Sequence, residues 1–116
     1  LEIDAALSAD GANFDLLDRL ESAGPYGSGH PQPVLAMPRH TIADARVVGE
    51  NHLRVDLRSQ TGARLQAMAF RTIGTDLGNF LLTNRGRAVH VAGTISSNWW
   101  NGQRSVQFRI EDAVLA

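Results

Sequence analysis

The chain has 116 residues, no cysteine, 43% hydrophobic residues and a formal net charge of −1 at pH 7. This length accommodates one small domain, or one domain with an appended segment. The lack of cysteine excludes disulfides and thiolate metal sites and predicts a cytoplasmic protein, and no apolar run approaches membrane-spanning length.

The charge is unevenly distributed along the chain. Residues 1–38 carry six acids against one arginine, whereas residues 39–110 carry ten arginines against four acids. Because the two parts are complementary in charge, we expect some docking of the acidic segment on basic surface of the same molecule.

Residues 13–24 have the pattern of a helix. Asn13 is a good N-cap, acids follow in the first turns where the helix dipole favours them, and Gly24-Pro25 ends the pattern. The apolar side chains share one face: Leu16, Leu17, Leu20 and Ala23.

The next segment, 24–33, holds three glycines and three prolines and predicts a stiff, irregular connector.

Residues 1–4 resemble the end of an earlier strand, so we expect the chain to be a piece of a longer protein. The predicted division is residues 1–24 as the tail of a preceding domain, 25–38 as the connector and 39–116 as the next domain. We expect that domain to fold without residues 1–33.

Strand patterns dominate after the connector. Segments 41–49 and 51–58 predict a hairpin around Gly49-Glu50-Asn51, with leucine and valine side chains alternating inward and polar ones outward. A third strand is predicted at 64–71. A short helix follows, which Thr75 begins and Asn84-Arg85-Gly86 ends, and two further strands are predicted at 87–95 and 105–114.

This order of elements predicts a mainly β fold. Three strands, a short helix and two strands form an OB-fold, a five-stranded Greek-key barrel with its helix between strands three and four. Here an N-terminal helix precedes the barrel. An SH3-like barrel is the alternative, but it explains the helix less well.

Two adjacent tryptophans lie next to the predicted turn between the last two strands. Asn101-Gly102 tolerates the positive φ angles of a type I′ hairpin turn. Since adjacent strand residues point to opposite faces, Trp99 and Trp100 cannot both enter one core, and at least one indole should lie near solvent. Such a pair suits stacking on nucleic-acid bases or sugars, or capping of the barrel end against a neighbouring domain.

Several segments resemble the RecJ family of bacterial single-stranded-DNA-specific exonucleases. Residues 25–33, Pro-Tyr-Gly-Ser-Gly-His-Pro-Gln-Pro, are similar to its Pro-Phe-Gly-x-Gly-Asn-Pro-x-Pro connector, although Tyr26 and His30 depart from it. Residues 66–70 match its Ala-(Ile/Met)-Ala-Phe strand, and 45–54 resemble its Val-Gly-x-x-His-Leu-(Lys/Arg) strand. Residues 98–102 and 105–112 are similar to its Asn-x-Trp-x-Gly and Gln-(Leu/Phe)-x-x-x-Asp endings.

The resemblance implies the OB domain of a 5′–3′ exonuclease acting in DNA repair and recombination, with residues 1–24 as the tail of its DHH-associated domain. Expected partners are single-stranded DNA, other domains of the same polypeptide and, as a further candidate, single-strand-binding protein. The alternative is a structural clamp or protein-docking module without DNA contact. A free-standing single-strand-binding protein and a carbohydrate-binding module fit less well.

The candidate DNA-binding residues combine arginine charge with aromatic stacking: Arg54, Arg58, Trp99, Trp100 and Arg104, then His52, Asn98 and Arg64.

Catalytic chemistry is not predicted for this segment. The family's two-metal site uses an Asp-His-His motif that the sequence lacks, and the four histidines have no metal-ligand spacing. Glu111 and Asp112 are neighbours on a predicted strand and point to opposite faces, so they cannot act as an acid–base pair. We therefore expect no catalytic residue, metal or cofactor here, while the resemblance implies Mg²⁺ or Mn²⁺ in the parent enzyme.

Overall fold

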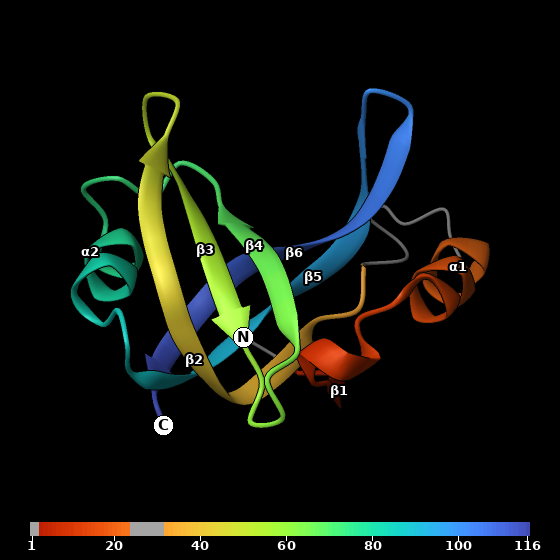
Figure 1. Cartoon of the computed structure of the whole chain (residues 1–116), viewed down its shortest axis with the longest axis horizontal. Helices are drawn as coiled ribbons and strands as arrows, with labels where there is room; N and C mark the ends of the chain where they lie inside the picture. Colours follow the sequence, from red (N-terminus) through yellow and green to blue (C-terminus); the bar gives the residue numbers. More distant parts are fainter. Residues whose placement is uncertain (1–2, 24–31) are drawn as a thin grey trace.

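The computed structural model describes residues 3–23 and 32–116. The elements in chain order are β1 (Ala5–Ala6), a 3-10 helix η1 (Ala9–Gly11), α1 (Phe14–Ala23), β2 (Leu35–Val48), β3 (His52–Arg58), β4 (Arg64–Ala69), α2 (Asp76–Thr83), β5 (Ala88–Trp100) and β6 (Gln103–Leu115). Figure 1 shows the strands crossing in a barrel, with the β2–β3 turn and the β5–β6 hairpin rising on the same side.

The sheet closes on itself as an OB-fold does. Its strand order is β1-β2-β3-β4-β6-β5, and β5 pairs back with β2, so the five long strands form a closed barrel. The β4–β6 pairing is parallel, whereas the other pairings within the barrel are antiparallel. Because α2 lies between β4 and β5, the third and fourth barrel strands, the OB-fold prediction is confirmed.

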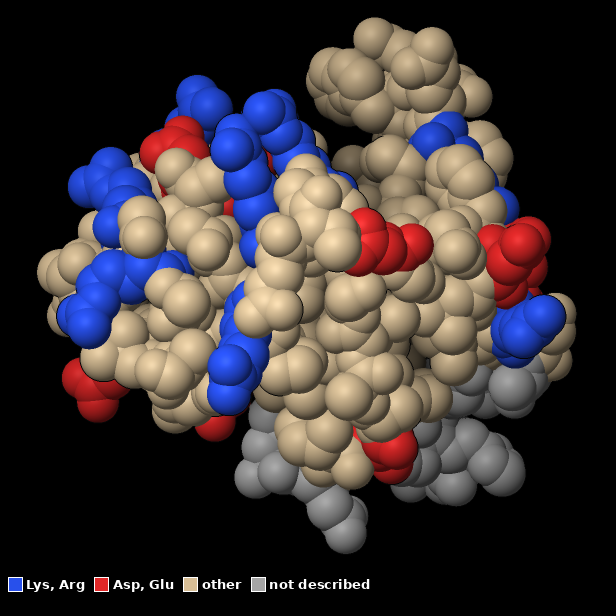
Figure 2. All heavy atoms as spheres, turned by 60° about the horizontal axis from the view of Figure 1, so that its bottom comes forward, with Lys and Arg blue, Asp and Glu red and all other residues tan. Residues whose placement is uncertain are grey.

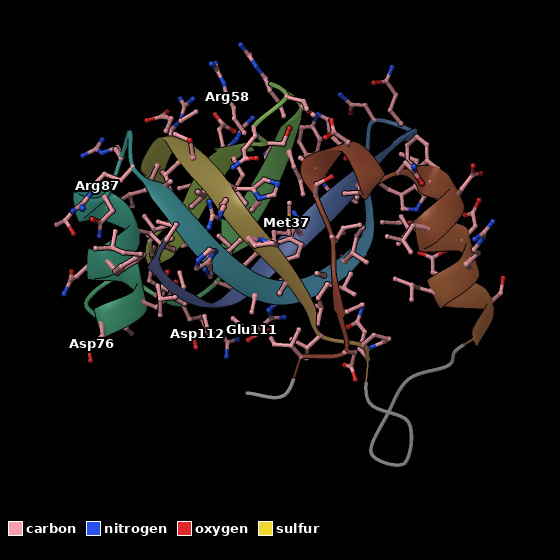
Figure 3. All side chains as sticks on the ribbon, turned by 90° about the horizontal axis from the view of Figure 1, so that it is seen from below. Met37, Arg58, Asp76, Arg87, Glu111 and Asp112 are labelled. Carbon is pink, nitrogen blue, oxygen red and sulfur yellow. The ribbon has the colours of Figure 1, made fainter. Side chains whose placement is uncertain are left out.

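Side-chain alternation holds along the barrel strands. On β3, Leu53, Val55 and Leu57 are buried, while the residues between them are half-buried or exposed. Phe108 and Ile110 of β6 are buried in the same core. Figure 3 looks at the barrel from below, with Met37 pointing inward and Arg58 pointing away.

The first barrel strand begins earlier than predicted. β2 starts at Leu35 instead of residue 41 and includes Pro38, next to which Arg39 adopts a positive φ of 53°. The β2–β5 register shifts between Met37 and His40, and a bulge of this kind accommodates a proline that has no N–H for the ladder. The strand therefore continues through a segment whose composition predicts a break.

Both predicted helix starts are confirmed. The Asn13 side chain accepts a hydrogen bond from the Leu16 N–H at 3.0 Å, and the Thr75 hydroxyl accepts one from the Gly78 N–H at 3.2 Å. These contacts satisfy N–H groups that have no partner within the first turn of a helix. The predicted end of α1 at Gly24-Pro25 lies outside the described residues.

The N-terminal segment packs into the barrel's core. Leu17 of α1 is fully buried and Ala9 of η1 nearly so, and both belong to the same apolar cluster as the barrel residues. The Ala9 N–H donates to Nε2 of the buried His40 at 3.0 Å. This packing argues against the expectation that residues 1–33 are dispensable, since their removal would open the core.

The two helices lie on opposite sides of the barrel, α1 beside the β5–β6 hairpin and α2 at the far side (Figure 1, Figure 3). Within the described part of the chain, no helix has the length and apolar character needed to cross a membrane.

Candidate nucleic-acid interface

Trp99 and Trp100 are the last two residues of β5. The β5–β6 hairpin projects from the barrel (Figure 1). Asn101 and Gly102 form its turn with φ angles of 49° and 74°, as a type I′ turn requires. In the register of β5 and β6, Trp99 lies opposite Arg104 and Trp100 opposite Gln103. The predicted turn chemistry is therefore confirmed.

The hairpin has two different faces. Ile95 and Phe108 are a buried cross-strand pair. Every second residue from this pair toward the turn points to the same face as Ile95 and Phe108 do. Ser97, Trp99 and Arg104 lie on that face, toward α1. The opposite face carries Asn98, Trp100, Gln103 and Ser105.

Both indoles are exposed to solvent. The exposed fraction is 64% for Trp99 and 75% for Trp100. This confirms the prediction that at least one of them lies near solvent, and neither indole fills the barrel end.

A groove separates the hairpin from the outer face of β3 and β4. It has a volume of about 560 Å³ and is lined by Arg54, Gln66, Asn98, Trp100, Gln103, Arg104 and Ser105. Four of the predicted site residues, from three different strands, are therefore brought together: Arg54, Asn98, Trp100 and Arg104.

Arg54 has unused hydrogen-bonding capacity in this groove. One of its terminal nitrogens donates to Gln66 Oε1 at 3.2 Å, which directs the guanidinium along the outer face of the sheet. Its Nε is buried and has no partner among the described residues. A buried donor without a partner is costly, so this N–H is suited to an acceptor that enters the groove.

A second groove adjoins the first. Its volume is about 340 Å³, and its lining includes Arg58 and Arg64, which lie opposite each other on β3 and β4. Gln66 lines both grooves, so they form one continuous surface. Asp44 and Asp56 also line the second groove and reduce its positive charge.

Arginine is the main charged residue on this side of the molecule. Figure 2 shows blue side chains spread over the left and centre of one face, with the uncharged end of the hairpin protruding beside them. Two of the arginines on the outer face of the sheet, Arg46 and Arg109, have exposed carboxylate partners at 3.4 Å. Exposed pairs of this kind are weak and leave the arginines accessible to other anions.

His52 lies apart from both grooves. Its Nδ1 accepts the Arg71 N–H at 2.9 Å, and its ring meets the Phe70 ring edge-on at 5.3 Å between centroids. The same Phe70 ring lies under Arg109, whose guanidinium carbon is 5.2 Å from the ring centroid. The structure therefore places His52 in a separate aromatic cluster.

Sequence reasoning missed three residues that line the main groove: Gln66, Gln103 and Ser105. Gln66 stands between inward-facing Leu65 and Ala67, so strict alternation would have identified it. Across residues 3–23 and 32–116, no group of three or more His, Asp or Glu side chains is placed to hold a metal ion.

The sequence is similar to those of known exonucleases. The sequence profile of the RecJ OB domain matches residues 3–112. The chain is 32% identical over 110 residues to the single-stranded-DNA-specific exonuclease RecJ of Salmonella typhimurium, covering 94% of this chain and 18% of that protein. It is 31% identical over 111 residues to the RecJ of Haemophilus influenzae, again covering 18% of the longer protein. The chain thus spans less than a fifth of these relatives.

Solved structures agree with this similarity. The crystal structure of RecJ in complex with Mn²⁺ from Thermus thermophilus matches with a TM-score of 0.74 and 25% identity, covering 100% of this chain and 16% of that one. The mitochondrial single-stranded DNA binding protein Rim1 of Saccharomyces cerevisiae matches with a TM-score of 0.55 and 15% identity, covering 71% of this chain and 92% of that one. The second match is a likeness of fold alone.

Proposed function

The chain belongs to the family of RecJ OB domains, and on that premise we propose that it is the single-stranded-DNA-binding module of a RecJ-type exonuclease. The parent enzyme would degrade single strands in the 5′–3′ direction, with Mg²⁺ or Mn²⁺, during DNA repair and recombination in the cytoplasm. Its catalytic residues would lie outside this segment. Its partners would be single-stranded DNA and other domains of the same polypeptide, with single-strand-binding protein as a further candidate.

The groove beside the hairpin carries this proposal. It combines the exposed indole of Trp100 with the buried, unpartnered Nε–H of Arg54. A nucleotide supplies a base to stack on the indole and phosphate oxygens to accept from the guanidinium. Non-specific binding of single strands needs this combination of stacking and backbone neutralisation, without readout of sequence.

The adjoining groove extends the path of the strand. From Trp100 the surface leads over Arg54 and Gln66 to Arg58 and Arg64. Asn98 borders the same path and offers an amide for hydrogen bonds to sugar or base. We propose that the strand crosses β3 and β4 along this line, with the hairpin holding one side.

A fluorescence titration tests the proposal. Both tryptophans lie in the hairpin, so an oligothymidylate binding in the groove should quench the emission of the 116-residue chain, while duplex DNA should compete poorly. If Arg54, Arg58 and Arg64 each neutralise one phosphate, log K against log salt should have a slope near −2, from roughly −0.7 per contact. Absence of salt-dependent binding would contradict the proposal.

A clamp or docking module is the second candidate. An apolar groove far from the hairpin supports it, with Ile3, Ala36, Val91, Ala113 and Val114 among its lining residues. Ile3 and Val114 are exposed and large, as expected of surface that packs on another domain. If the chain is only a clamp, the titration will detect no DNA binding at any salt concentration.

A further inference from the structure

Arg104 lines the groove between the hairpin and the outer face of β3 and β4, but its guanidinium contacts residues of α1 and Ser97. We propose that Arg104 is a positioning residue: it fixes the β5–β6 hairpin against α1 so that Trp100 faces the groove, and it does not bind phosphate. This inference rests on the proposed function. It makes α1, which precedes the barrel in the sequence, a working part of the DNA site.

Four groups hold the guanidinium of Arg104. Nη2 lies 2.7 Å from Asp18 Oδ1 and 3.5 Å from Glu21 Oε2, and Nε donates to the Ser97 hydroxyl at 3.0 Å. The Phe14 ring lies under the guanidinium, with 4.9 Å from Cζ to the centroid. The Ser97 hydroxyl in turn donates to Glu21 Oε1 at 2.8 Å, which joins α1 to both strands of the hairpin.

These contacts leave Arg104 little capacity for phosphate. Two carboxylates face one guanidinium, so the cluster has a net negative charge. Only 22% of the Arg104 side chain is exposed. A phosphate that approached the guanidinium would also lie close to the carboxylates of Asp18 and Glu21, and like-charge repulsion opposes this. Arg54 has an unpartnered Nε, and it takes part in none of the ion pairs found among residues 3–23 and 32–116.

The contacts of Ser97 and Arg104 with α1 lie where the β5–β6 hairpin leaves the barrel. A two-stranded ribbon is only marginally stable by itself, and this one leaves the barrel after the last buried pair, Ile95 and Phe108. Ser97 and Arg104 lie just beyond that pair. They attach the hairpin where it would otherwise bend.

α1 is a firm support because it is part of the core. Its Leu17 is fully buried in the barrel's apolar cluster. Arg104 therefore connects the packed core, through α1, to the free end of the hairpin. Trp100, on the opposite face and four residues before Arg104 in the chain, then stands over the groove with Arg54.

Variants of the 116-residue chain separate positioning from phosphate binding. Arg104→Gln removes the charge and most of the contacts. A double variant, Phe14→Ala with Ser97→Ala, loosens the same junction without changing the charge. Arg54→Gln is the control for a phosphate contact. Arg87→Gln removes one arginine beside α2, on the far side of the barrel (Figure 3). Measured quantities are the affinity for an oligothymidylate, its salt slope, the melting temperature and the tryptophan anisotropy without DNA.

If Arg104 positions the hairpin, Arg104→Gln and the neutral double variant should both weaken binding by at least about fivefold, the low end of one stacked base. Neither should change the salt slope, whereas Arg54→Gln should flatten it by about 0.7. Both junction variants should lower the anisotropy of the free chain, since the indoles gain motion. Arg87→Gln should change none of these.

Two results would overturn the inference. One is a slope flattened by about 0.7 in Arg104→Gln, as in Arg54→Gln, which would make Arg104 a phosphate ligand. The other is tighter binding in the neutral double variant, which would make α1 a competitor of DNA. If the unaltered chain does not bind single strands, the proposed function fails instead, and the anisotropy still tests whether α1 restrains the hairpin.

Discussion

Replacing each tryptophan in turn separates the two faces of the hairpin. Trp100→Ala removes the indole that lines the groove beside Arg54, and Trp99→Ala removes its neighbour on the α1 side. If Trp100 stacks on a base, its loss should cost about 1–3 kcal/mol of single-strand affinity, or roughly 5- to 150-fold. Trp99→Ala should leave the affinity nearly unchanged, which makes it a matched control in the same hairpin.

The exposure of Trp100 limits the effect on folding. An indole exposed to 75% has about a quarter of its surface covered. With roughly 200 Å² for a tryptophan side chain and about 25 cal/mol per Å², this corresponds to about 1 kcal/mol of unfolding free energy. For a domain of this size the melting temperature should fall by no more than about 4–8 °C.

The assay is binding of a dye-labelled oligothymidylate, because the variants change the intrinsic fluorescence, together with thermal unfolding followed by circular dichroism. Equal losses of affinity in Trp99→Ala and Trp100→Ala would refute the assignment of the two faces. Unchanged affinity in both, with a sharp fall in melting temperature in either, would assign the pair to packing and favour the clamp.

Three further predictions concern the fold and the chemistry. Leu17→Ala, at a fully buried position on α1, should cost about 2–5 kcal/mol in a chemical unfolding experiment, whereas an unchanged midpoint would separate α1 from the core. Gly93→Ala should cost about 1–3 kcal/mol or prevent folding, because a Cβ there would lie 1.8 Å from the Arg109 carbonyl oxygen; normal stability would contradict that close approach. Added Mg²⁺ or Mn²⁺ should not release nucleotides from single-stranded DNA, and metal-dependent cleavage by a pure preparation would place catalytic residues in this segment.

Local signals were sufficient for most of the fold. The Asn101-Gly102 turn, the Asn13 and Thr75 caps and the alternation of β3 each depend on residues within a few positions of one another. Their order along the chain then limited the topology to a five-stranded barrel with a helix before its fourth strand. The structure confirmed these predictions because the backbone preferences and the core agree at each of these sites.

Long-range pairing decided what the local signals missed. Residues 35–40 lie in a proline-rich stretch, yet they form the start of β2 because β5 supplies hydrogen bonds on one side and β1 on the other. A bulge at Met37–His40 accommodates the proline. The pattern is mostly strand-like from Val34 onward, but nothing within this stretch identifies those partners, so the predicted strand began only at residue 41.

The candidate site was predicted in composition more than in arrangement. Alternation correctly places Arg54 and Arg58 on one outer face, and the groove brings Arg54 together with Asn98 and Trp100. Alternation along the strands does not reveal that Arg104 faces α1, because its partners Asp18 and Glu21 are more than eighty positions away in the chain. The charge complementarity of the two segments predicted that the acidic segment docks on basic surface, but it did not identify Arg104 as the arginine involved.

The division into domains shows why composition and packing give different answers. Glycine and proline in the connector predict a break in regular secondary structure, and that prediction places α1 with a preceding domain. Cooperativity, however, follows shared burial, and Leu17 and Ala9 lie in the same apolar cluster as the barrel strands. A segment can therefore be separate in sequence and still belong to the unit that unfolds together. If α1 unfolds with the barrel, a substitution that loosens Leu17 in the core should also loosen the contact of α1 with Arg104 and the hairpin.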